Sequence, residues 1–134
     1  MSQSARGTFH VTMNAEPPYD VAEGAKLGRV SITKQFQGDL EASSTVQMLS
    51  AVSEVKGSAG YVAIERVTGA LHGRRGSFVL QHSGTMNRGK ASLVVMVVPD
   101  SGTAELRGIA GTLAIDIVDG KHFYTFEYTL EGSA

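Results

Sequence analysis

Cysteine is absent from this sequence of 134 residues, proline occurs only three times, and the charges nearly cancel. With no cysteine, the chain has neither a disulfide framework nor thiolate chemistry. Its 12 basic and 13 acidic residues leave a formal net charge of −1, so no strong field attracts nucleic acid. We therefore expect no nucleic-acid partner.

Long apolar runs are also missing. The amino terminus has no apolar stretch of signal-peptide length, and the longest apolar run, from Leu93 to Pro99, has the length of a strand. A membrane-spanning helix needs about 18 or more consecutive apolar residues. We therefore expect no membrane association, a cytoplasmic location, and one domain over residues 1–134.

The sequence does contain repeated alternation of apolar and polar residues between glycine-bearing breaks. Such alternation predicts β-strands. It runs through residues 9–13, 30–36, 61–69, 77–83, 113–117 and 124–130, and Asp119-Gly120 is typical of a tight turn between the last two. Residues 91–98 form a further strand-length run that is apolar on both faces. Residues 43–56 fit either a short helix or an eighth strand.

Eight short strands with little room for helices predict an all-β fold. Such a meander has to protect its two edge strands, and closure into a single antiparallel barrel removes both edges. An eight-stranded barrel has an interior just wide enough for side chains or for one small ligand. A two-sheet sandwich is the alternative, and alternation alone does not separate the two.

The hairpin over residues 60–84 carries charged residues among apolar ones. If His72-Gly73 form its turn, Glu65 and His82 become diagonal neighbours on one face, about 7–8 Å apart by backbone. A carboxylate beside an imidazole fixes its tautomer, so the pair suits general acid–base catalysis. Ligand contact without chemistry and a purely structural pair are the alternatives. A one-residue slip in register would place the two residues on opposite faces.

The same face is rich in apolar and aromatic side chains. Tyr61, Phe78 and Leu80 lie on it, and Tyr124, Phe126 and Tyr128 form a stripe on the last strand. Core packing explains such residues, and so does lining of a ligand cavity, because tyrosine combines an apolar ring with a hydroxyl group. We expect these six residues to contact a small apolar or aromatic ligand.

Other motifs are weak. The four histidines show no spacing typical of metal ligands, and no cysteine assists them. No Gly-x-Ser-x-Gly elbow, phosphate loop or dinucleotide motif occurs. We therefore expect no metal and no cofactor, and a hydrolase or metal enzyme is disfavoured.

Four longer stretches are familiar. GDLEASST (38–45), GYVAIERVTGALHGRRGSFVLQHSGTM (60–86), PDSGTAELRGIAGTL (99–113) and HFYTFEYTL (122–130) resemble the bacterial family labelled domain of unknown function 3224. That family is associated with the allene-oxide-cyclase-like β-barrel, and GTAELRGIAG is similar to a glycine-bearing motif of dirigent proteins. The resemblance implies an eight-stranded antiparallel barrel with a central cavity, few or no helices, and a strand over 43–56. It implies no activity, and no functional residue is transferred from either group.

Two functions follow as hypotheses. In the first, the barrel binds a small apolar or aromatic molecule, and any chemistry is a cofactor-free isomerisation or cyclisation in which His82 moves a proton and Glu65 orients it. In the second, a filled barrel serves as a non-catalytic interaction module. The strand at 93–98 would then join copies of the chain, with a homo-oligomer, a dimer above all, as the expected assembly. Whether the protein is an enzyme stays open.

Overall fold

The structure is a computed structural model that describes residues 2–130. Within that range, the chain forms nine strands and one short 3-10 turn, η1 (Ala104–Leu106). The strands are β1 (Gln3–Ala15), β2 (Asp20–Ala22), β3 (Ala25–Gly38), β4 (Leu40–Ser53), β5 (Ala59–Leu71), β6 (Arg74–Asn87), β7 (Lys90–Val97), β8 (Ile109–Val118) and β9 (Lys121–Leu130). No helix in this range is long and apolar enough to cross a lipid bilayer.

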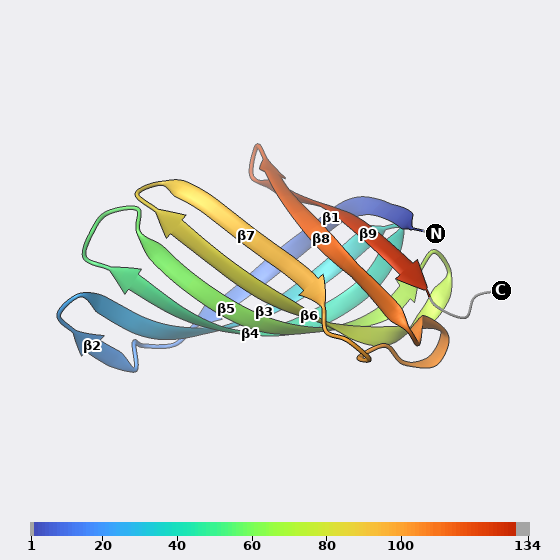
Figure 1. Ribbon diagram of the computed structural model, residues 1–134, viewed down its shortest axis with the longest axis horizontal. Helices are drawn as coiled ribbons and strands as arrows, with labels where there is room; N and C mark the ends of the chain where they lie inside the picture. Colours follow the sequence, from blue (N-terminus) through green and yellow to red (C-terminus); the bar gives the residue numbers. More distant parts are fainter. Residues whose placement is uncertain (1, 131–134) are drawn as a thin grey trace.

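Eight of the strands close into an antiparallel barrel (Figure 1). Consecutive strands are neighbours from β3 to β9, and β1 pairs with both β9 and β3, which closes the ring. The ninth strand, β2, has three residues and extends the sheet along the edge of β3. The prediction of an all-β, eight-stranded antiparallel barrel is confirmed. Residues 43–53 of the ambiguous stretch belong to strand β4 and not to a helix.

The β5–β6 hairpin has the register that its turn residues favour. His72 and Gly73 both have positive φ, of 47° and 79°, as a type I′ turn requires. Leu71 therefore pairs with Arg74, and the ladder continues through Glu65 opposite Leu80 and Ala63 opposite His82. Glu65 and His82 consequently share the inner face of the barrel.

One end of the barrel is closed by packed side chains. The buried cluster there comes from every strand of the ring and from η1, whose Leu106 has almost no exposed surface. Its aromatic members stack on one another, with the ring centroids of Phe78 and Phe126 5.5 Å apart and those of Phe126 and Tyr128 5.2 Å apart. This end therefore holds a conventional hydrophobic core.

The other end is open along one side. Strands β7 and β8 pair at a single position, Met96 opposite Thr112, and the β8–β9 hairpin stands apart from the β6–β7 hairpin (Figure 1). Inner-face residues there remain exposed by 42–65%, namely Met13, Met86, Leu93 and Ile117. Solvent therefore reaches the inner surface of the sheet at this end.

Candidate functional site

Four polar side chains meet inside the barrel, one from each of four consecutive strands. Lys34 comes from β3, Ser44 from β4, Glu65 from β5 and His82 from β6. Each lies at an inner-face position, because side chains along a strand alternate between the two faces and their neighbours two residues away are buried. The sheet thus aligns the four residues across neighbouring strands.

Glu65 is the centre of this group. Its Oε1 accepts hydrogen bonds from Lys34 Nζ at 3.1 Å and from His82 Nε2 at 2.7 Å, while its Oε2 accepts one from Ser44 Oγ at 2.6 Å. The exposed fractions are 0% for Glu65, 8% for Lys34 and 4% for His82. A carboxylate without contact to water is retained only where such partners replace the water, and here three do.

These partners also set the charge state of Glu65. Burial raises the pKa of its carboxyl group, but the hydrogen bond from His82, the positive charge of Lys34 and the hydrogen bond from Ser44 together outweigh burial. The pKa of Glu65 therefore lies below its ordinary value, and the side chain is a carboxylate at neutral pH.

The carboxylate in turn fixes the imidazole of His82. An ionised carboxylate only accepts hydrogen bonds, so His82 Nε2 carries the proton that it donates to Glu65. When the ring is neutral, Nδ1 is then its basic atom. Within residues 2–130 no group bonds to Nδ1, and no fully buried side-chain nitrogen or oxygen lacks a partner, so Nδ1 keeps some accessible surface. His82 can therefore accept a proton or a hydrogen bond at Nδ1.

Lys34 lies between the carboxylate and two aromatic rings. Its Nζ is 4.9 Å from the ring centroid of Phe9 and 6.0 Å from that of Phe36. A cation over an aromatic face is attracted by the ring quadrupole, which offsets part of the cost of burying the ammonium group. The pair of Lys34 and Glu65 is neutral overall, so the cluster carries a net charge only when His82 is protonated.

Tyr61 adds a hydroxyl group on the exposed side of the cluster. It lies four residues before Glu65 on the same face of β5, and its ring covers Gly84 of β6, where a Cβ atom would come within 2.5 Å of the ring. The lack of a side chain at Gly84 gives the Tyr61 ring its place. Burial and then the charge of Glu65 raise the pKa of Tyr61, so the phenol stays neutral and can donate a hydrogen bond.

The other predicted ligand contacts lie in the closed end. Phe78, Leu80 and Phe126 are buried against one another and their neighbours. The Tyr124 hydroxyl accepts a hydrogen bond from the Leu40 N–H and donates one to the Gln37 carbonyl, and the Tyr128 hydroxyl contacts His72. Of the six residues predicted to contact a ligand, Tyr61 and Leu80 lie beside the polar cluster, and of these two only Tyr61 is partly exposed, because Leu80 is fully buried opposite Glu65.

Sequence reasoning selected Glu65 and His82 but missed Lys34 and Ser44. A signal for both was present, since Lys34 alternates in step with Ile32 and Phe36, and Ser44 with Ala42 and Val46. A search for polar residues at inner-face positions of neighbouring strands would have identified both residues. Among the described residues, no group of three or more His, Cys, Asp or Glu side chains is placed to hold a metal ion.

The fold and the cluster define a class: a closed antiparallel barrel with a charged group buried inside. The family model described as "Protein of unknown function (DUF3224)" matches residues 5–128, so the chain belongs to this family. A crystal structure of a DUF3224 protein of unknown function from Shewanella oneidensis MR-1 is 49% identical, with a TM-score of 0.92 over 98% of this chain and 99% of that one. No curated protein matches the chain.

Proposed function

We propose that this protein binds a small molecule with an apolar or aromatic body against the exposed inner face of the barrel's open end. The observation that carries the proposal is the position of the Glu65 cluster, which lies inside the barrel where the closed core gives way to exposed apolar residues. Natural ligand sites combine mostly apolar walls with a few well-placed polar groups, and this inner face has that composition.

The polar end of such a ligand would lie at His82. Nδ1 of His82 is the basic atom left free by the bond to Glu65, and the Tyr61 hydroxyl is a neutral donor nearby. Both positions are held rigidly by strands, which favours a defined ligand orientation. A ligand with one hydroxyl, enol or carbonyl group on an apolar body fits this pair of groups.

The apolar body would occupy the exposed inner surface. Met13, Met86 and Leu93 lie on that surface from three different strands, and methionine adapts to irregular ligand shapes. Entry is open where β7 and β8 separate beyond Met96 and Thr112. The ligand therefore reaches the cluster without opening the closed core.

The chemistry available there is proton transfer. Nδ1 of His82 would take a proton from a C–H or O–H group of the ligand and return it to another atom of the same molecule. Glu65 would hold the ring through Nε2 and stabilise the imidazolium that forms in between. The net reaction is an isomerisation that conserves atoms and electrons, so it needs no cofactor.

Ligand binding is tested with adjacent inner and outer residues of β7. Leu93 faces inward and its neighbour Ser92 outward, and both are exposed. We expect Leu93→Arg to weaken binding of the uncharged fluorescent probe Nile red at least tenfold, because the guanidinium group enters the apolar surface. Ser92→Arg should leave the affinity within about twofold of the wild type.

Native mass spectrometry against a broad library of apolar compounds extends this test to natural ligand classes. Equal effects of the two arginine variants, or a protein that stays empty across the library, would contradict the proposal. Thermal unfolding of both variants serves as the control for folding.

A second function, self-association, is favoured by an apolar patch on the outer face of β4–β7. We propose that a second copy of the chain covers it. The patch consists of side chains exposed by 43–55%, namely Leu49, Val62, Ile64, Val94 and Met96. The residues that separate them are uncharged, Gln47, Gln81 and Ser83, as in the core of a protein interface.

The size of this patch suits a modest dimer. Four strands at a spacing of about 4.8 Å, over about 20 Å of strand length, give a footprint on the order of 400 Å². Two such faces bury on the order of 800 Å² in total, less than the roughly 1,200 Å² of stable interfaces, so the dimer should be weak and depend on concentration. Sedimentation should show a dimer that Val62→Lys splits and that Val118→Lys, at an exposed residue outside the patch, does not. A wild-type protein that is monomeric at every concentration would exclude this function.

A further inference from the structure

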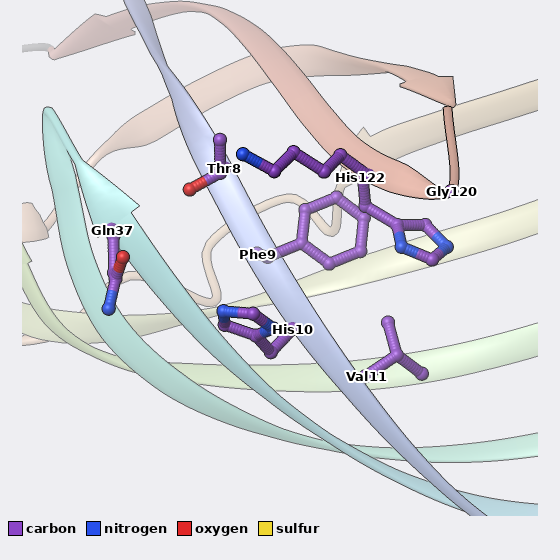
Figure 2. A pocket seen from close by; sticks show the side chains of 8 residues that line it. Thr8, Phe9, His10, Val11, Gln37, Gly120 and His122 are labelled. Atoms are coloured by element: carbon purple, nitrogen blue, oxygen red, sulfur yellow. The ribbon is translucent and has the colours of Figure 1, made fainter. Parts of the chain in front are cut away.

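A pocket lies at the rim of the barrel, on the far side of Phe9 from Lys34. The ladder between β1 and β9 ends where Phe9 pairs with His122, whereas β1 continues to Ala15 beside β3 alone. The notch left beside β1 holds a pocket of about 330 Å³ (Figure 2). Its lining residues are Thr8, Phe9, His10, Val11, Gln37, Gly120, Lys121 and His122.

One wall of this rim pocket is aromatic. The rings of Phe9 and His122 pack with their centroids 5.0 Å apart, and Val11 lies further along β1 on the same side (Figure 2). Phe9 is buried and is held from behind by the ammonium group of Lys34. The two rings are tilted by 40° to each other and Phe9 is only 4% exposed, so His122 supplies most of the aromatic surface that faces the pocket.

The other wall is polar and carries positive charge. Thr8 and His10 alternate with Phe9 and Val11 along β1 and therefore face the other side of the sheet, Gln37 comes from β3, and Lys121 begins β9. None of the eight lining residues is a carboxylate, and the nearby Asp119 is not among them. Lysine and protonatable histidine without an acidic neighbour favour an anion.

The polar groups of the rim pocket are also free to bind. Within the described part of the chain, the side chains of Thr8, His10, Gln37, Lys121 and His122 make no hydrogen bond or ion pair to any other residue. This contrasts with the Glu65 cluster, where each polar side chain is bonded to Glu65. Five side chains with unpartnered donors or acceptors therefore line a cavity that has one aromatic wall.

We infer that the rim pocket is a binding site for small organic anions with a flat apolar body, such as aromatic carboxylates. The ring of such a ligand packs against His122, which the buried Phe9 ring supports, and its anionic group faces Lys121 and His10. The volume suits a single ring with short substituents. This site is separate from the proposed ligand surface inside the barrel, and it stands without it.

The test compares two ligands that share a ring and differ in charge. Benzoate and benzylamine are titrated into the ¹⁵N-labelled protein, and the backbone amide shifts are followed. Benzoate should give saturable shifts at residues 8–11, 37 and 120–122, and benzylamine should give none at the same concentrations. Shifts of similar size with both compounds, benzoate shifts clustered elsewhere, or no saturable shift would overturn the inference.

Two variants connect the binding to the proposed groups. His10→Gln combined with Lys121→Gln should weaken benzoate binding about tenfold, because it removes the Lys121 ammonium group and the His10 imidazole from the polar wall. Lys90→Gln changes an exposed lysine at the start of β7 and should leave binding unchanged. Unweakened binding in the double variant would also refute the site. As a control for folding, the amide spectrum of each variant outside the pocket should match that of the wild type.

Discussion

A carboxylate with no exposed surface depends on its partners, and Glu65 takes three from three neighbouring strands. The ammonium group of Lys34 balances its charge, Ser44 occupies the second oxygen, and His82 contributes the shortest contact to Oε1. Removing one member of such a group leaves the others buried without compensation. The cluster is therefore a point where single substitutions have large effects.

The first prediction at this scale concerns stability at neutral pH. Glu65→Gln keeps the shape of the side chain but leaves the ammonium group of Lys34 without a counter-charge. We expect the free energy of unfolding to fall by about 3 kcal/mol. Urea denaturation measures the difference, and Glu127→Gln, at an exposed residue of β9, should cost less than about 0.5 kcal/mol. A loss at position 65 no larger than at position 127 would show that Lys34 does not need the carboxylate.

The second prediction concerns acid. Because the pKa of Glu65 is lower in the folded protein than its ordinary value of 4.5, the folded carboxylate contributes stability above that pH. The contribution is lost as the pH falls from about 4.5 through the lower folded pKa. The stability gap between wild type and Glu65→Gln should therefore shrink on acidification in this window. Urea curves at several pH values measure the gap, and a gap that widens in acid would reverse the sign of the argument.

At the scale of elements, strands β7 and β8 form the weak seam of the barrel. Their one pair, Met96 with Thr112, sets a register that would bring Val94 opposite Ala114 and Leu93 opposite Ile115. In this register the inner residues of one strand meet those of the other. Further pairing of β7 with β8 would therefore need no shift in register, and such pairing would cover the exposed inner face.

The seam yields a prediction that the cysteine-free chain makes easy to test. In Val94→Cys/Ala114→Cys, the two thiols are the only ones in the protein and lie opposite each other in the continued register. We expect oxidation to join the strands and to block binding of the apolar fluorescent probe, with recovery on reduction. The pair Val94→Cys/Ile115→Cys points to opposite faces and should cross-link much more slowly. Unchanged probe binding in the oxidised first pair would show that ligands do not enter through the seam.

The strands and turns also show which features of the fold can be predicted from the sequence. Alternation located six of the eight strands and an apolar run located a seventh at 91–98, and His72-Gly73 fixed the β5–β6 register, because turn geometry and the two-residue period are local properties. Residues 43–56 kept a helix-like spacing of Val46, Leu49, Val52 and Val55, and pairing with β3 and β5 decided for a strand. Local propensity does not contain that long-range pairing.

At the scale of the whole molecule, the barrel has two unlike halves. The closed end is filled by aromatic side chains that the sequence offered as ligand contacts, whereas the open end exposes apolar residues that the sequence did not single out. Residues on the same face of a strand look alike in sequence. Their burial depends on where β7 separates from β8 and where β9 separates from β1. These separations are set by how the whole ring of strands closes, which no single strand encodes. This is why sequence reasoning found the Glu65–His82 pair but placed most of the ligand contacts in what is the core.

Both ligand binding at His82 and the proposed proton transfer require that Glu65 holds His82 through Nε2 and leaves Nδ1 accessible. Long-range ¹H–¹⁵N spectra of the imidazole, assigned with His82→Gln, read the protonated nitrogen directly at a pH where the ring is neutral. We expect a single Nε2-protonated tautomer in the wild type and a mixture of tautomers in Glu65→Gln. A wild-type ring protonated at Nδ1, or one indifferent to the loss of the carboxylate, would contradict this expectation.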